Sequence, residues 1–226
     1  LEEMKAKGMG RAEIYDLLAM HNPDGMYGVG PEFLGDESVQ SILHALAEGK
    51  RLGIQIGMVA SSGWNAGGPW VKPDWAAKAL YTSTLSLVGP SIYSGILPLP
   101  QFPKQCPKDK NGVPQYMKEI AIMAIRDNPD KKIKTSGDVI MLNKQFDGKN
   151  LQWQVPEGKW IILRFVCSNT GQHLIVPSPN SDGLQIDFLD PKATTRYLQH
   201  ILNRLRITKQ NAKTSGLSYL SFDSME

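Results

Sequence analysis

Residues 54–75 read IQIGMVASSGWNAGGPWVKPDW, and this stretch decides the expected fold. Its first seven residues form a continuous apolar run. Such a run is typical of a strand that is covered on both faces, as in a parallel sheet. A glycine-rich loop follows directly. We therefore expect this loop at the carboxyl end of the strand, where α/β proteins carry their binding sites.

The chain around this strand has an α/β pattern. Residues 38–51 put their apolar side chains on one stripe, and Gly53 supplies a helix stop. A second helix is expected over residues 73–80, because proline and aspartate begin it. Residues 26–29 read as a short strand. Residues 1–83 are therefore expected to form the first part of an α/β domain.

Residues 84–183 change to a β pattern, in which turn signals such as Gly89-Pro90 separate short apolar segments. The strand-like segments are 85–88, 92–97, 117–125, 139–142, 151–155 and 160–167. Arg164 interrupts the last of them, and we expect it to pair with an acid inside this domain.

The α/β pattern returns in residues 184–226. Residues 184–188 read as a strand, Asp190 and Pro191 begin a helix, and residues 217–222 read as a final strand. Strand–helix units that are interrupted by a run of strands indicate an α/β domain with an antiparallel β domain inserted in one loop.

The composition argues against several classes of protein. The net charge is +3, and the basic residues are scattered, which is not the pattern of a nucleic-acid-binding surface. No run approaches the roughly 18 to 20 apolar residues of a membrane span. Cys106 and Cys167 match no metal motif, and whether they pair stays open.

The loop after the central strand carries two candidate binding residue types. Trp64 and Trp70 offer aromatic faces that stack on the C–H faces of sugars, and Asn65 offers a donor and an acceptor to hydroxyl groups. Two interpretations remain open: a sugar-binding loop, or a packed loop whose tryptophans anchor it to the core.

Two acidic positions follow strand-like segments. Asp223 and Glu226 come directly after the last strand, where a carboxylate can be desolvated and its pKa raised, as a general acid requires. Asp187 ends the strand predicted at 184–188. The alternative interpretation is structural in each case. Asp223 and Glu226 would belong to a solvated terminal segment, and Asp187 would belong to a turn before the next helix.

Five stretches, taken in order, resemble glycoside hydrolase family 106, the α-L-rhamnosidase-type enzymes. They cover most of the chain. They read GWNAGGPW at 63–70, QWQVPEGKWIILRF at 152–165, NTG at 169–171, DGLQIDFLDP at 182–191 and FDSME at 222–226. The stretch MYGVGPEFLG at 26–35 is only a loose match to the family.

The resemblance implies a fold and an activity. The fold would be a partial (β/α)8 TIM-type barrel, about strands 2–4, with an inserted antiparallel β domain. The activity would be inverting cleavage of terminal α-L-rhamnosides or related sugars. Glu226 would be the general acid at the end of strand four, with Asp223 as its neighbour. Calcium is implied as an accompanying ion, with no ligands that can be assigned.

The resemblance also implies partners and a location. Trp64, Asn65 and Trp70 would line the sugar pocket, and Asp187 would make a polar contact. The catalytic base would come from another part of the parent chain, so residues 1–226 alone are expected to be inactive. Such enzymes are exported to the periplasm or beyond. The alternatives are a different barrel glycosidase and a non-catalytic carbohydrate-binding module.

Overall fold

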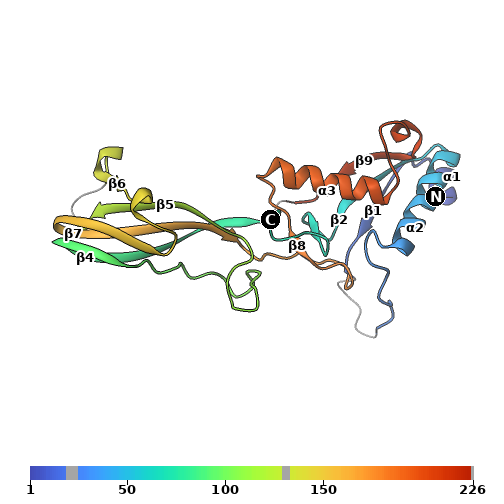
Figure 1. Cartoon of the computed structure of the whole chain (residues 1–226). Coiled ribbons are helices and arrows are strands. Elements are labelled where there is room, and N and C mark those ends of the chain that lie inside the picture. The colour runs from blue at the N-terminus through green and yellow to red at the C-terminus, as the bar shows by residue number, and fades with distance from the viewer. Residues whose placement is uncertain (19–24, 129–132, 225–226) are drawn as a thin grey trace. The chain divides into compact units, whose positions relative to one another are not determined.

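The computed structural model describes residues 1–18, 25–128 and 133–224, which fall into two compact units (Figure 1). The α/β unit comprises Leu1–Ala77 and Gly171–Glu226, and the β unit comprises Lys78–Thr170. The changes of pattern predicted from the sequence lie at 84 and 183.

A three-stranded parallel sheet forms the centre of the α/β unit. Its strands are β1 (Arg11–Asp16), β2 (Gln55–Ser62) and β9 (Leu217–Ser221), in the order β1-β2-β9. The helices α2 (Asp36–Leu52) and α3 (Pro191–Arg204) pack with this sheet (Figure 1). The expected strand at 54–60, the helix expected at 38–51 and the helix that Asp190 and Pro191 begin are therefore confirmed.

The core of the α/β unit lies between the sheet and the two helices. Its buried side chains include Ile42 and Leu46 from α2, Ile56 and Met58 from β2, and Tyr197 from α3. One stripe of each amphipathic helix is buried in this way, as its apolar spacing predicts. The two faces of β2 are both covered, which explains its continuous apolar run.

One predicted strand of the α/β unit is wrong, and another is shorter than expected. Residues 26–29 form no strand; the outer strand is β1, at Arg11–Asp16. The strand expected at 184–188 is only β8 (Leu184–Gln185), which pairs antiparallel with β3 (Gly67–Gly68). The following residues turn directly into α3. A short helix, α1 (Glu2–Ala6), precedes β1. Within the described residues, three parallel strands are present and no closed barrel.

The β unit is an antiparallel sheet in the order β4-β7-β5-β6. Its strands are β4 (Lys78–Ile96), β5 (Met117–Arg126), β6 (Val139–Met141) and β7 (Asn150–Asn169). Short 3-10 helices, η1 (Ser136–Asp138), η2 (Asn143–Gln145) and, in the α/β unit, η3 (Ala212–Thr214), complete the described elements. In Figure 1, β4 and β7 run alongside each other over their length.

Strand β4 corrects two predictions. The helix expected at 73–80 is absent, because Lys78 already pairs with Asn169 in the sheet. The turn signal at Gly89-Pro90 does not end the strand but forms a bulge opposite Gly158. A side chain at Gly89 would lie 2.0 Å from the carbonyl oxygen of Pro156, so glycine lets the two strands continue past each other.

The inner face of the β unit has its own core. Beyond the bulge, the end of the β4–β7 ribbon folds over, and Trp153 packs edge-to-face on Trp160 at a ring distance of 5.5 Å. Both indoles are nearly buried, with 8% and 4% exposed. They therefore act as core residues of this unit.

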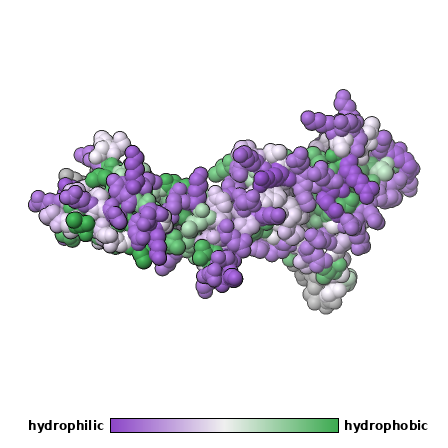
Figure 2. Space-filling model, in the orientation of Figure 1, coloured by the Kyte–Doolittle hydropathy of each residue, from purple (hydrophilic) through white to green (hydrophobic). Residues whose placement is uncertain are grey.

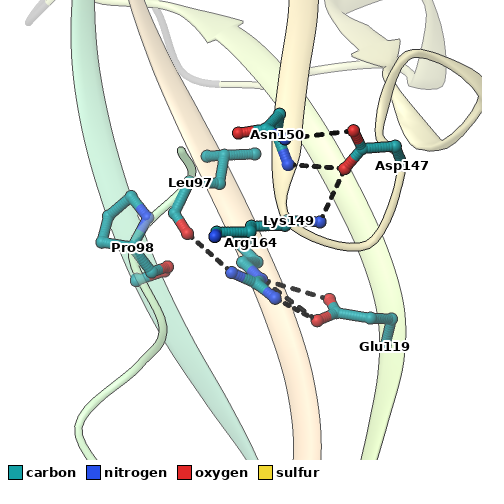
Figure 3. Close-up of polar contacts among 8 residues, drawn as sticks. Leu97, Pro98, Glu119, Asp147, Lys149, Asn150 and Arg164 are labelled. Carbon is teal, nitrogen blue, oxygen red and sulfur yellow. Dashed lines mark hydrogen bonds and ion pairs between the residues drawn. The ribbon is translucent and has the colours of Figure 1, made fainter. Parts of the chain in front are cut away.

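Arg164 is buried in this unit with 3% of its surface exposed, and it pairs with Glu119 as expected (Figure 3). Its Nε donates to Glu119 Oε1 at 3.2 Å, and its Nη1 donates to the carbonyl oxygen of Leu97 at 2.7 Å. Its guanidinium also lies over the ring of Phe146. One charged side chain thus joins β7, β5 and the chain after β4.

The surface of both units is mainly polar in the view of Figure 2, with hydrophobic residues reaching it in several places. Cys106 and Cys167 are not joined by a disulfide. In the part of the chain that the structure describes, no helix is long and apolar enough to cross a membrane.

Candidate functional site at the carboxyl edge of the parallel sheet

The carboxyl ends of β1, β2 and β9 meet at one edge of the sheet, because all three strands are parallel. Asp16 pairs with Ser62 at this edge, and the backbone N–H of Gly63 donates to the carbonyl oxygen of Asp16 at 2.7 Å. The N–H of Ser224 donates to the carbonyl oxygen of Trp64 at 3.0 Å. The ends of all three strands are thus tied together, and we call this region the carboxyl edge.

Tyr15 and Asp223 form a hydrogen-bonded pair at the carboxyl edge. Partial burial, this hydrogen bond and the negative charges of Asp223 and Glu13 raise the pKa of Tyr15 to about 12. The neutral phenol therefore persists at physiological pH and can donate its proton to the carboxylate. Glu13 of β1 accepts a hydrogen bond from the hydroxyl group of Ser221 in β9, which is a second side-chain contact between residues of these two segments.

A chain of buried hydroxyl groups extends from Asp16 into two loops. Ser62 donates its hydroxyl proton to Asp16 and accepts from the backbone N–H of Ser178 at 2.8 Å. Ser178 and Ser181 share a hydrogen bond at 2.7 Å, and the N–H of Phe33 donates to the Ser181 hydroxyl at 2.8 Å. The network holds residues 31–35 and 171–183 against the carboxyl edge.

Asn65 has both ends of its side-chain amide in use. Its Oδ1 accepts from the N–H of Ile175 at 2.7 Å, and its Nδ2 donates to the carbonyl oxygen of His173 at 3.3 Å. Only 1% of its surface is exposed. In the structure, Asn65 therefore clamps the loop of residues 171–183, and the substrate-binding role remains a prediction.

The two tryptophans of the loop have different surroundings. The ring of Trp70 stacks on His200 at 4.5 Å and on Tyr197 at 6.0 Å, so it packs against α3. Burial lowers the pKa of His200, with a smaller effect from the charge of Arg204. Trp64 is partly exposed at the carboxyl edge, beside Ser224. Trp64 is thus better placed than Trp70 to meet a ligand there.

Asp187 lies in the turn before α3. Its Oδ1 accepts from the N–H of Leu189 at 3.1 Å, and its backbone N–H donates to the carbonyl oxygen of Trp75 at 2.9 Å. Asp190 then caps α3 by accepting from the N–H of Lys192 at 2.9 Å. Asp187 therefore has the role of a turn residue before the next helix, which was the alternative interpretation of the sequence. A sugar contact by Asp187 stays a prediction.

The predicted catalytic pair is described only in part. Asp223 is exposed at the carboxyl edge, where the sequence places it, whereas Glu226 lies outside the described residues. His173 Nδ1 and Asp182 Oδ2 share an exposed hydrogen bond at 2.9 Å.

Sequence reasoning missed three polar residues of the carboxyl edge: Glu13, Tyr15 and Asp16. All belong to β1, which was not expected as a strand. The signal was available, because RAEIYD at 11–16 alternates polar residues with Ala12 and Ile14, the period of a half-buried strand. The acidic and aromatic residues of this short segment reach the site only because β1 pairs with β2.

Calcium stays an expectation from the family resemblance. Across residues 1–18, 25–128 and 133–224, no three His, Cys, Asp or Glu side chains come together as potential metal ligands. Calcium also binds backbone and amide oxygens, so this finding assigns no ligands to the ion.

The comparison with known proteins decides the family. A model of the family described as alpha-L-rhamnosidase matches residues 1–109 and 105–226. The chain belongs to glycoside hydrolase family 106. This family 106 chain is 28% identical over 233 residues to a protein of Formosa agariphila named "Putative beta-glucuronidase". The match covers 91% of this chain and 19% of that protein.

A solved structure shares the fold of the family 106 chain. The rhamnosidase from Novosphingobium sp. PP1Y aligns with a TM-score of 0.61 at 16% identity, over 91% of this chain and 34% of that one. The likeness concerns the fold alone. The chain thus spans about a fifth of the length of the curated relative and a third of that of the structural neighbour.

Proposed function

We propose that this chain is part of a glycoside hydrolase that cleaves terminal α-L-rhamnosides, with Glu226 as the general acid. The observation that carries the proposal is the carboxyl edge. There β9 delivers Asp223 beside the ends of β1 and β2, and Glu226 follows three residues later in the sequence. Membership of family 106 supports the reaction class.

The proposed mechanism needs two carboxyl groups. Glu226 gives its proton to the glycosidic oxygen as the bond to the leaving group breaks. A second carboxylate removes a proton from the water that attacks the opposite face of the sugar, and about 6.5 to 9.5 Å between the two groups leaves room for that water. We place this base outside residues 1–226. Tyr15 would orient Asp223 next to the acid through their hydrogen bond.

The remaining parts of the proposal concern the pocket and the setting. The three parallel strands would belong to a (β/α)8 barrel that other parts of the protein complete. Trp64 would stack on the sugar, with Asn65, Trp70 and Asp187 supporting or lining the pocket. The protein would be exported to the periplasm or beyond, as suits an enzyme that acts on external carbohydrates.

The deciding experiment uses the complete parent protein and its Glu226→Gln variant. Release of rhamnose is measured from an aryl α-L-rhamnoside and from a natural disaccharide. Because glutamine cannot donate the proton, we expect activity on the disaccharide to fall by about 10² to 10⁴. The aryl substrate, whose leaving group needs less protonation, should lose less. Equal activity of the two proteins on the disaccharide would move the acid to another residue.

A second candidate activity is cleavage of β-glucuronides, which the name of the curated relative favours. An aryl β-glucuronide in the same assay separates the two substrates. The alternative of a binding module has less support, because Trp153 and Trp160 of the β unit lie in its core and offer no sugar-stacking surface.

A further inference from the structure

The outer face of the β unit carries rows of apolar side chains. Residues paired across an antiparallel sheet point to the same side, so the register identifies the rows. One row joins Val139, Ile125 and Ile161, and it ends at Ser86 on β4. These residues lie opposite to the face that holds Trp160 and Ile162 of the core. The full set, called the outer face, is Val139, Met141, Ile125, Met123, Ala121, Ile161, Leu163, Phe165, Cys167, Leu80, Thr82, Thr84 and Ser86.

The outer face is accessible in the structure. Met141 and Leu80 have 54% and 56% of their surface exposed, and Leu163 and Phe165 in the centre are partly exposed. Apart from Ala121, its residues on β5, β6 and β7 are not fully buried, and the two hydrophobic cores contain no residue of the set. A sheet face in water is normally polar, so this chemistry indicates a covering partner.

The margins of the outer face are charged. Lys118 lies in register with Cys167 at one end. Lys159 lies in register with Val88 at the other end, where the N–H of Asp127 donates to its carbonyl oxygen at 3.0 Å. The residues between these margins are uncharged, and an uncharged centre with charged margins is the usual anatomy of a protein interface. Its partner should therefore present an apolar patch with a polar rim.

The size of the outer face favours a partner on the same polypeptide. Four strands about 4.8 Å apart and seven residues of about 3.4 Å give roughly 400 Å². A stable dimer buries about 800 Å² of accessible surface on each partner, about twice this flat footprint. A tethered domain needs less area, because the linker supplies a high effective concentration. Both comparison proteins extend far beyond the matched region, which provides such domains.

We propose that the outer face docks an apolar surface of another domain of the longer protein, outside residues 1–226. This proposal does not depend on the activity assigned to the carboxyl edge. It would also explain why WIILRFVC at 160–167 is apolar at nearly every position: β7 is covered on one side by its own core and on the other by the docked domain.

The test compares two cysteine variants of the complete protein. Thr84→Cys lies on the outer face, and Ser94→Cys, the matched control, lies on the same strand beyond the bulge; both native hydroxyl residues are exposed in the structure. Each thiol is labelled with a benzophenone maleimide, and labelling and photocross-links are followed by peptide mass spectrometry. We expect the thiol at position 84 to react at least about tenfold more slowly, because docking must open first. The native Cys167 is an internal reporter of the same face.

Cross-links from position 84 to peptides outside residues 1–226 of the same molecule would support the proposal. Equal labelling of positions 84 and 94 would overturn it. Protection that disappears on dilution would assign the face to a second copy instead, and cross-links confined to residues 1–77 or 171–224 would assign it to the α/β unit. Both of these results contradict the proposed partner.

Discussion

Arg164 illustrates how a single residue organises the β unit. Its guanidinium is almost fully buried, and it satisfies both Glu119 and the carbonyl oxygen of Leu97. A buried ion pair of this kind adds little net stability compared with apolar packing, but removal of one partner is costly, because the other charge is left without compensation.

We therefore predict that Arg164→Met lowers the free energy of unfolding of the β unit by about 3 kcal/mol. The value lies at the low end for buried pairs, because the Glu119 side chain keeps 31% exposure and water screens it. The measurement is urea unfolding of the complete protein. Arg164→Met combined with Glu119→Gln should recover part of the loss, and a double variant as unstable as the single one would contradict this account.

Tyr15 gives a prediction on pH. Its folded pKa is raised to about 12, above the usual value of about 10 for an unfolded tyrosine. The folded state therefore holds the proton more tightly, and the resulting stability is fully present below pH 10 and is lost as the pH rises towards 12. In Tyr15→Phe, we expect a shallower decrease of stability with pH over this window. Thermal unfolding as a function of pH checks it, and identical slopes would exclude the Tyr15–Asp223 contact as the cause.

At the scale of elements, the packing of β9 on β2 depends on one glycine. The ring of Tyr219 lies over Gly57, and a side chain there would approach Tyr219 Cζ to 2.1 Å. The guanidinium group of Arg11 also lies over the Tyr219 ring, with its carbon 5.3 Å from the ring centre. The close approach of β9 to β2 thus requires the absence of a side chain in the middle of the apolar run.

We predict that Gly57→Ala destabilises the α/β unit by about 1 to 3 kcal/mol, as is usual for overpacking. The measurement is the shift in its unfolding transition in the complete protein. Because the clash is with the ring, Gly57→Ala combined with Tyr219→Leu should be more stable than Gly57→Ala alone. Equal stability of these two variants would show that the ring is not the obstacle.

At the scale of the whole molecule, the described chain brings Asp223, the neighbour of the proposed acid, to the carboxyl edge. We propose that the base lies in another part of a longer protein; the curated relative is itself longer, and this chain spans 19% of it. Among the described residues, the outer strands β1 and β9 each have one edge that no further strand pairs, and a closed barrel would pair these edges.

We predict that residues 1–226, produced alone, do not hydrolyse α-L-rhamnosides, because inversion needs both carboxyl groups. The assay is sugar release at high protein concentration, with the complete protein as the positive control. Circular dichroism of the same sample tells a folded but inactive chain from an unfolded one. Turnover by the folded fragment would place the base within these 226 residues.

Local patterns were sufficient for much of the fold. The stripes of α2 and α3, the Asp190 cap and the apolar run of β2 are set by residues close in sequence, so their periodicity identified them. The buried Arg164 was also expected to find an acid, because an unpaired charge inside a β core is too costly. The family followed from motifs of adjacent residues that match as short strings.

The sequence by itself therefore determined α2, α3, the central strand, the family and the acidic end of β9. Only the tertiary structure decided that 11–16 is a strand and that β4 continues past Gly89. It also decided that the buried Asn65 amide makes its hydrogen bonds to residues 173–175. Each of these depends on a partner more than 40 residues away: β2 for β1, β7 for β4, and residues 173–175 for Asn65. Local propensity carries no information about such partners, because their pairing free energy exists only when the chain is folded.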